Sequence, residues 1–280
     1  MKFCFKDRSF ELGKKTYVMA IMNVTPDSFS ENGVNFALNK AIENAKQMIA
    51  AGVDVIDVGG ESTRPGAPEV GIKEEISRVV PFIKALREFS DIPVSIDTWK
   101  SEVAKAAIEA GADIINDVTG FHRDSKLKEV AAKYGVGCIA MHMRGTPQTM
   151  QNKENLQYTD LVEEISGYFK DTARMLEEAG VGPQKIMLDP GIGFSKNLEQ
   201  NLELVRELET FRVLGYPLFL GPSRKSFIGQ VLDIKEPENR VWGTAAVIAV
   251  GIRNGADMIR IHDFEEMVQV AQMADALRAR

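Results

Sequence analysis

The sequence predicts an α/β fold: one (β/α)8 TIM barrel over residues 1–280, with a short N-terminal hairpin and long loops at the C-terminal face of the barrel. Apolar runs of strand length alternate with helical patterns along the chain, without a break in composition. Most of these runs end abruptly in polar residues, as 53–60 and 186–190 do. No GxGxxG motif follows the first strand, which argues against an open dinucleotide-binding sheet.

The expected elements follow one another in regular order. Residues 3–12 predict a hairpin that closes the bottom of the barrel. The expected strands, all apolar, lie near 17–23, 53–58, 93–97, 113–117, 136–141, 185–189, 217–220 and 257–261. Apolar residues at helical spacing predict helices between them, including a long one from Leu161 to Gly180. Long Gly-, Pro- and Ser-rich segments also follow strands and therefore belong to the catalytic face: 23–36, 59–71 and 142–155.

Composition excludes several classes of function. The chain has 34 basic and 40 acidic residues, a net charge of −6, so bulk attraction to nucleic acid or to an anionic membrane is not expected. No stretch approaches about 18 uncharged apolar residues, and the start of the chain lacks the apolar run of a signal peptide. Cys4 and Cys138 lie far apart with no CxxC spacing, which fits a reducing compartment. We therefore expect a cytoplasmic protein.

Three strand ends carry carboxylates and amides. Asp97, the pair Asn116 and Asp117, and Asp189 each close an expected strand. A carboxylate accepts two parallel N–H bonds from an amino-pyrimidinone edge, and an asparagine supplies both a donor and an acceptor. Each residue alone could instead be a helix N-cap, Asp97 most readily because Thr98 follows it. Together at one rim, they predict a site for a heterocycle rich in N–H donors.

Basic residues follow the last two strands. Ser223 and Lys225 lie in GPSRKSFIG, at a position where many barrels bind an anion. Arg260 and His262 flank one residue, so both point to the same side of the eighth strand. The simpler alternative is one Arg–Asp pair and a buried histidine. Grouped at one rim, these residues predict local positive charge that the acidic chain otherwise lacks.

The first two strands end in residues suited to a metal and a phosphate. Asn23 can offer its carbonyl oxygen to a hard metal ion, or can simply form the turn before Thr-Pro. In DVGGESTRPG, Thr63 is a hydroxyl donor and Arg64 is a planar fork for phosphate, unless the loop is only a solvated surface turn. Asp57 of the same segment either contacts the ligand or braces the Gly59–Gly60 turn, and we favour bracing.

Taken together, these segments resemble the dihydropteroate synthase family across nearly the whole chain. The matching motifs, in chain order, are MNVTPDSFS, DVGGESTRPG, SIDT, INDVTG, MHMRGTP, LDPGIGF, SRKSF, GTAA and RIHD. The resemblance implies a transferase of folate biosynthesis that condenses 6-hydroxymethyl-7,8-dihydropterin diphosphate with 4-aminobenzoate, giving 7,8-dihydropteroate and pyrophosphate. It also implies a Mg²⁺ cofactor, a sulfonamide-binding aminobenzoate site, and a homodimer formed through late helices.

The resemblance further implies a role for each site residue. The catalytic group comprises Asp97, Asp189, Lys225, Arg260 and His262. The pterin site adds Asn116, Met141 and Phe194, with Arg260 stacked on the ring. Asn23 ligates Mg²⁺, and the phosphates lie among Thr63, Arg64, Arg260 and His262. The aminobenzoate site is formed by Phe29, Arg64, Pro65 and Ser223.

The chain departs from the family pattern at two places, and two other functions compete with the synthase. Glu31 and Asn32 replace the usual SFSDGG ending, and Ser195 replaces the usual glycine of GFGK, where it could tighten the pocket wall. A methyltetrahydrofolate methyltransferase-like enzyme would share a pterin pocket but would not need cations around a diphosphate. A non-catalytic pterin-binding paralogue is supported only by the altered SFSENG segment.

Overall fold

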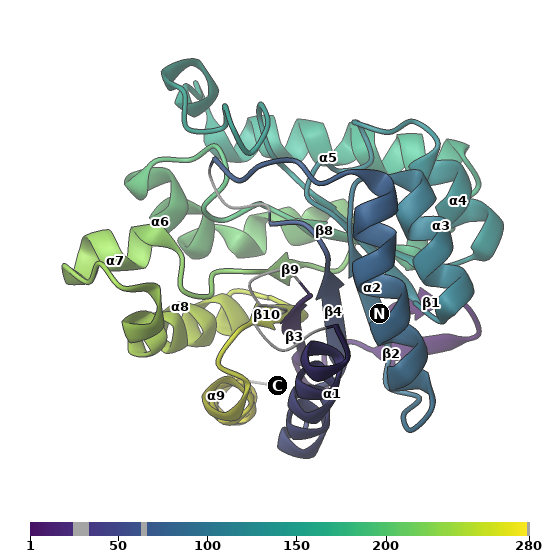
Figure 1. The fold of residues 1–280 in the computed structure, drawn as a ribbon. Helices are drawn as coiled ribbons and strands as arrows, with labels where there is room; N and C mark the ends of the chain where they lie inside the picture. Colours follow the sequence, from purple (N-terminus) through teal and green to yellow (C-terminus); the bar gives the residue numbers. More distant parts are fainter. Residues whose placement is uncertain (25–33, 63–65, 279–280) are drawn as a thin grey trace.

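The described part of the chain forms an eight-stranded parallel barrel surrounded by helices (Figure 1). The computed structural model describes residues 1–24, 34–62 and 66–278. The barrel strands are β3 (Tyr17–Asn23), β4 (Val55–Gly59), β5 (Val94–Asp97), β6 (Ile114–Asp117), β7 (Gly137–Met141), β8 (Ile186–Asp189), β9 (Phe219–Leu220) and β10 (Met258–Ile261). They pair in the order β8-β7-β6-β5-β4-β3-β10-β9, and a bridge between Leu188 and Leu218 closes the ring. The predicted barrel is confirmed.

Helices follow the strands and cover the outside of the barrel, as Figure 1 shows. They are α1 (Val34–Ala51), α2 (Ile72–Arg87), α3 (Ser101–Ala110), α4 (Leu127–Tyr134), α5 (Leu161–Glu178), α6 (Leu198–Arg206), α7 (Ser226–Leu232), α8 (Val241–Arg253) and α9 (Phe264–Leu277). Both α7 and α8 follow β9. No described helix has the length and the apolar character that a membrane span requires.

The strand boundaries agree with the predicted ones to within two residues. The largest shortfall is β9, which covers only 219–220 of the predicted 217–220. At its start, the Leu218 N–H donates to a carboxylate oxygen of Asp257 at 3.0 Å. The Asp257 side chain, rather than the backbone of a neighbouring strand, thus accepts the Leu218 N–H. Regular strand pairing therefore begins at Phe219.

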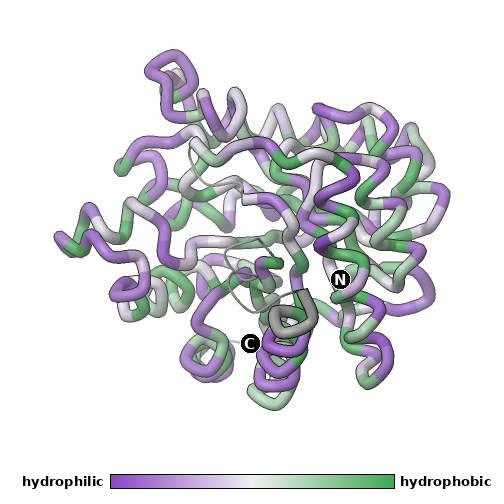
Figure 2. The backbone as a smooth tube through the Cα atoms, viewed as in Figure 1, coloured by the Kyte–Doolittle hydropathy of each residue, from purple (hydrophilic) through white to green (hydrophobic). Residues whose placement is uncertain are grey.

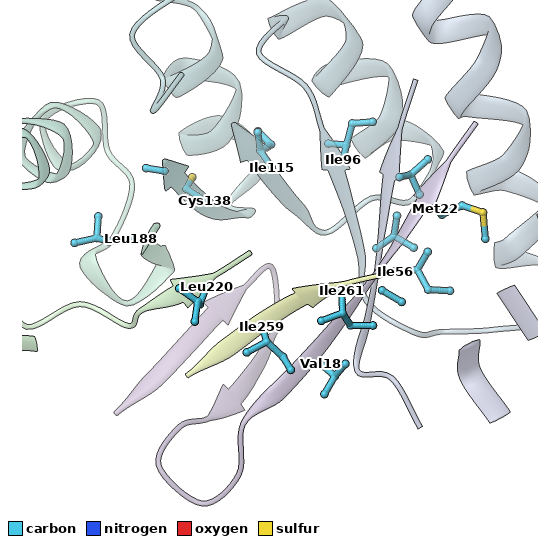
Figure 3. Close-up of a cluster of buried hydrophobic side chains, with 14 of the residues drawn as sticks. Val18, Met22, Ile56, Ile96, Ile115, Cys138, Leu188, Leu220, Ile259 and Ile261 are labelled. Atoms are coloured by element: carbon cyan, nitrogen blue, oxygen red, sulfur yellow. The ribbon is translucent and has the colours of Figure 1, made fainter. Parts of the chain in front are cut away.

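Alternate residues of each strand face opposite sides and build two cores. Val18 and Met22 of β3 belong to the larger core, which packs the strands against the helices. Figure 3 shows these side chains together with Ile56, Ile259 and others from neighbouring strands. In Figure 2 the hydrophilic colour gathers on the outer helices and loops, which agrees with a core between the two layers. Met19, between Val18 and Met22, faces the barrel interior instead.

A short hairpin closes the bottom of the barrel, as predicted. It consists of β1 (Lys2–Phe5) and β2 (Arg8–Glu11), which pair antiparallel. Phe3 and Phe5 are both 0% exposed and belong to one buried cluster with Met19 and other inward-facing strand residues. Aromatic side chains thus fill this end of the described barrel, which leaves the carboxyl ends of the strands as the end at which a ligand can enter.

Candidate active site

Strand register places the predicted polar residues in one row at the open end of the barrel. Asn23 of β3 lies beside Gly59 of β4, which lies beside Asp97 of β5. Asp97 in turn lies beside Asn116 of β6. Gly59 has no side chain, and a Cβ there would lie 3.6 Å from Asn23 Oδ1 and 3.7 Å from Asp97 Cβ. The row therefore contains a notch between an amide oxygen and a carboxylate.

A cavity lies at this end of the barrel. Its walls combine apolar side chains with carboxylates, an amide and two cationic groups. They are formed by Asp97, Asn116, Val118, Met141, Asp189, Ile192, Phe194, Phe219, Gly221, Lys225 and Arg260. The structure thus brings together seven residues of the predicted site: Asp97, Asn116, Met141, Asp189, Phe194, Lys225 and Arg260. An apolar pocket with a few converging polar groups is typical of a small-molecule site.

Arg260 lies between two buried carboxylates. Its Nε donates to Asp57 Oδ2 at 2.6 Å, and its Nη2 donates to Asp97 Oδ2 at 2.7 Å. The same Asp57 oxygen accepts from Asn116 Nδ2 at 3.2 Å. Asp57 therefore has a bracing role, as we favoured, but it braces the side chains of Arg260 and Asn116 rather than the Gly59–Gly60 turn. The reason is that Asp57 faces the barrel interior, where Arg260 reaches it from the last strand.

The Asp97 carboxyl has a strongly perturbed acidity. Burial raises its pKa from the ordinary value to about 7, the attraction of Arg260 opposes that rise, and the negative charge of Asp57 adds to it. A buried carboxyl that titrates near neutrality is frequent at functional sites.

Asp189 and Lys225 form the other polar side of the cavity. Burial raises the pKa of the Asp189 carboxyl to about 6, against a hydrogen bond from the Gly191 N–H at 2.8 Å and the attraction of Lys225. Burial likewise lowers the pKa of the Lys225 ammonium to about 7, which Asp189 opposes. Lys225 Nζ donates to the Ile192 carbonyl at 2.9 Å and lies 3.8 Å from the centre of the Phe194 ring. Both charges are therefore held in place before any ligand binds.

Lys196 is a site-forming residue that the sequence reasoning missed. Its ammonium is buried and donates to the Phe194 carbonyl at 2.9 Å and to His142 Nδ1 at 3.0 Å. Burial lowers the pKa of Lys196 to about 7 and that of His142 well below its usual value. Both residues support the cavity wall from behind. Lys196 lies in the loop after β8, and nothing in the GFSK segment itself indicates that this lysine is buried.

Ser223 and His262 lie together beside the cavity. The Ser223 hydroxyl accepts from the His262 backbone N–H at 3.1 Å and lies 3.0 Å from His262 Nδ1. Ser223 is buried, and it follows β9 by way of Gly221, whose absent side chain leaves room beside Arg260. Ser223 thus orients the histidine of the next strand.

Asp117 does not belong to the cavity, although it closes the same strand as Asn116. Its carboxylate accepts from the Thr119 N–H at 2.8 Å and from the Phe121 N–H at 2.6 Å. Consecutive strand residues face opposite sides, so only one of the pair points into the barrel. The predicted residues Phe29, Glu31, Asn32, Thr63, Arg64 and Pro65 lie outside the described residues.

Residues 19–262 match the family model described as "Pterin binding enzyme". The barrel, with carboxylates, an amide and cations around one cavity at its open end, is therefore that of a pterin-binding enzyme. The match spans every barrel strand except the first two residues of β3.

Individual relatives show to which family of pterin-binding enzymes the chain belongs. The dihydropteroate synthase of Synechocystis sp. is 50% identical over 268 residues, which cover 96% of this chain and 92% of the relative. The Yersinia pestis dihydropteroate synthase with a sulfonamide drug has a TM-score of 0.92 and 39% identity, with 100% of each chain covered. The Xanthomonas albilineans dihydropteroate synthase with 4-aminobenzoic acid has a TM-score of 0.90 and 34% identity, covering 100% of this chain and 98% of that one. The chain belongs to the dihydropteroate synthase family.

Binding of a pterin is expected to weaken as the pH falls through about 6, the pKa of Asp189. A protonated carboxyl cannot accept two N–H bonds, so the dissociation constant should rise about tenfold for each pH unit below that value. Calorimetric titration between pH 5 and 8 measures this, and a dissociation constant independent of pH would contradict it.

The free energy of unfolding of the ligand-free protein depends on pH in the opposite direction to pterin binding. The folded chain holds the Asp189 proton more tightly than the unfolded chain, because the folded pKa is raised. This contribution to the free energy of unfolding is therefore complete below the ordinary pKa of 3.8 and is lost as the pH rises through about 6.

Proposed function

We infer that the protein catalyses the dihydropteroate synthase reaction. In this reaction, 6-hydroxymethyl-7,8-dihydropterin diphosphate and 4-aminobenzoate condense to 7,8-dihydropteroate and pyrophosphate. The observation that carries the proposal is the cavity itself, whose lining combines Asp97, Asn116 and Asp189 with the cations Lys225 and Arg260 at the open end of the barrel. The family membership of the chain supports the same activity.

The buried carboxylates and the amide bind the pterin ring. Asp189 accepts two N–H bonds from the amino-pyrimidinone edge, and Asn116 pairs with a neighbouring donor and acceptor. Lys225 donates to a ring nitrogen or carbonyl oxygen. Met141 and Phe194 provide apolar contact for the ring faces, with the Arg260 guanidinium stacked on one of them. The low dielectric of the buried site strengthens each of these contacts.

The diphosphate binds at the mouth of the cavity. Arg260 and His262 contact its oxygens, together with Thr63 and Arg64. Asn23 fits one position of a Mg²⁺ ion, because its amide oxygen lies beside the notch at Gly59. Mg²⁺ commonly takes few protein ligands and completes its shell with phosphates and water. When bound, the ion neutralises charge on the leaving diphosphate.

The protein assists the reaction by positioning and by electrostatics. The bond between the pterin methylene carbon and the diphosphate oxygen breaks, and its electron pair leaves with the diphosphate. The arylamine nitrogen then forms the new C–N bond and loses a proton to solvent. Ionised Asp97 and Asp189 stabilise the positive charge that develops on the pterin, while Arg260 and His262 stabilise the departing diphosphate. Ser223 orients His262 and contributes to the carboxylate end of the arylamine site.

A direct assay tests this function. The purified protein is incubated with both substrates and Mg²⁺, and pyrophosphate release is followed together with dihydropteroate formation. Equal amounts of the two products are expected, with neither formed when 4-aminobenzoate is omitted. Tight pterin binding without turnover would instead identify a non-catalytic paralogue. Transfer of a methyl group from methyltetrahydrofolate would identify the other alternative.

We also propose that the protein is a homodimer joined through α7, α8 and α9. These helices expose large apolar side chains to solvent: Val231, Leu232, Trp242, Val250, Met273 and Leu277. Trp242 is 77% exposed, and Val250, eight residues later, lies on the same face of α8. An exposed apolar surface of this kind on one side of a globular protein favours contact with a second copy.

Replacing Trp242 with lysine is expected to convert the dimer to a monomer, because a charge at the centre of an apolar interface must be desolvated. Sedimentation velocity at micromolar concentration measures the change. Val213→Lys is the control, since Val213 is 85% exposed but lies outside this surface, in the turn before β9. A wild-type protein that sediments as a monomer would refute the dimer.

We further propose that the protein works in the cytoplasm. Cys4 and Cys138 are both free thiols in the structure. Burial raises the pKa of the Cys138 thiol, which makes it a weak nucleophile and an inert core residue. Two unpaired cysteines of this kind are compatible with a reducing compartment.

A further inference from the structure

Ser195 of the GFSK segment joins Phe194 to the segment that follows β7. It lies in the segment after β8, is 0% exposed, and has a positive φ of 47°. Its hydroxyl donates to the Phe194 carbonyl at 2.8 Å and accepts from the Arg144 N–H at 2.9 Å. One side chain therefore holds a cavity-lining residue and the start of the segment after β7.

The backbone of Ser195 holds the other end of that segment. Its carbonyl accepts from the Tyr158 hydroxyl at 3.0 Å. The Arg144 guanidinium lies 3.8 Å from the centre of the Tyr158 ring and donates to the Gln157 carbonyl. Residues 144–158, which we call the β7 rim loop, thus close on themselves and attach to Ser195 at both ends.

The β7 rim loop also contacts the segment after β4, four strands away from β8 in the barrel order. The Gly66 N–H donates to the Pro147 carbonyl at 3.2 Å. Gln148 Nε2 donates to the Ala67 carbonyl at 2.9 Å. The β7 rim loop therefore contacts Ser195 at its two ends and the segment after β4 through Pro147 and Gln148.

Removing the Ser195 hydroxyl should affect the mouth more than the floor of the cavity. The Phe194 carbonyl keeps a second donor, Lys196 Nζ at 2.9 Å, so the wall against the pterin retains its support. The Arg144 N–H loses its bond to the Ser195 hydroxyl, so among the described residues the start of the β7 rim loop is then held only by the Arg144 side chain, which contacts Gln157 and Glu164. The β7 rim loop contacts Gly66 and Ala67, which directly follow Arg64 and Pro65 of the expected aminobenzoate site in the sequence, so a loosened loop should affect the second substrate.

We propose that Ser195 is a positioning residue for the arylamine substrate, acting by holding Phe194 and the β7 rim loop at the mouth of the cavity. The proposal rests on the synthase function inferred above, in which the pterin occupies the cavity and the arylamine nitrogen forms the new C–N bond. It assigns to Ser195 a role in the affinity for the second substrate, without contact with the reacting atoms.

Steady-state kinetics of Ser195→Ala and Ser195→Gly test the proposal. Both variants should raise the KM for 4-aminobenzoate about fivefold, the factor that one net hydrogen bond supplies, with kcat and pterin affinity changed less than about twofold. Ser195→Gly should have the higher melting temperature of the two, because glycine adopts a positive φ without steric cost. Ser166→Ala is the matched control, since its hydroxyl donates to the Val162 carbonyl within α5, away from the mouth.

Two kinetic results would overturn the role of Ser195. One is an unchanged KM for 4-aminobenzoate, and the other is a loss of pterin affinity and kcat as large as the rise in that KM. Hydrogen exchange gives a readout independent of catalysis, and the amides of 144–158 should exchange faster in Ser195→Ala than in the wild type or in Ser166→Ala. Unaltered exchange there would also overturn the proposal. A wild-type protein without synthase activity would reject the proposed function, while the exchange experiment would still decide whether Ser195 holds the loop.

Discussion

Replacing Arg260 with methionine is expected to lower the free energy of unfolding by about 3–5 kcal/mol at pH 8 and to abolish activity. The variant leaves Asp57, 0% exposed, and Asp97, 7% exposed, without their common cation. Removing one partner of a buried ion pair costs more than the pair itself contributes, because the remaining charges stay desolvated. Denaturant unfolding monitored by circular dichroism measures the loss.

The pH dependence separates this cause from a simple packing defect. At pH 5 the Asp97 carboxyl, whose pKa is raised to about 7, is protonated, so the difference between Arg260→Met and wild type should shrink. Arg260→Lys should fall between the two, since an ammonium cannot donate to both carboxylates with the geometry of a guanidinium. The control is Arg174→Met, whose guanidinium pairs with exposed Asp171 on α5. A difference that is the same at pH 5 and pH 8 would argue against the electrostatic explanation.

Replacing Asp189 with alanine is expected to weaken pterin binding at least about a hundredfold. The loss corresponds to two hydrogen bonds to a charged acceptor, each contributing about 1.5–3 kcal/mol in a desolvated site. Turnover should fall by a similar factor, because the same carboxylate stabilises charge in the transition state. Isothermal titration calorimetry with a pterin ligand at pH 8 gives the affinity directly.

Two further variants make the Asp189 result specific. Asp189→Asn keeps the side-chain size and an acceptor for the Gly191 N–H, which Asp189 Oδ1 accepts at 2.8 Å, so the strand end should stay folded while pterin affinity is lost. Asp171→Asn removes an exposed carboxylate on α5 and should leave binding unchanged. Unchanged affinity in Asp189→Ala would refute the assignment of Asp189 to the pterin.

The architecture and most of the cavity could be predicted because they depend on local patterns. Buried strands that end in Asp, Asn or Arg identify both the barrel and the rim at which a ligand binds. Asp97, Asn116 and Asp189 were therefore predicted as neighbours, and the cavity contains all three.

Side-chain direction and distant partners could not be predicted in the same way. Whether Asn116 or Asp117 faces the cavity depends on strand register, and a shift of one residue exchanges them. The partner of Asp57 is Arg260, 203 residues later in the chain, and no periodic pattern connects the two. Lys196 escaped notice for a related reason, since its burial arises from the packing of two loops that meet only in the folded barrel.

The hairpin at the bottom of the barrel has a consequence for how the chain folds. Phe3 and Phe5 share one buried cluster with Met258 of β10, so the first and last parts of the barrel interior depend on each other. Contacts of such large sequence separation form late, because loop closure must come first. Until β10 pairs with β3, this cluster remains incomplete and its aromatic rings stay accessible. A growing chain on the ribosome therefore cannot complete this cluster until β10, the last of the described strands, has emerged. Chaperones that bind apolar segments can act on the exposed aromatic rings during that interval.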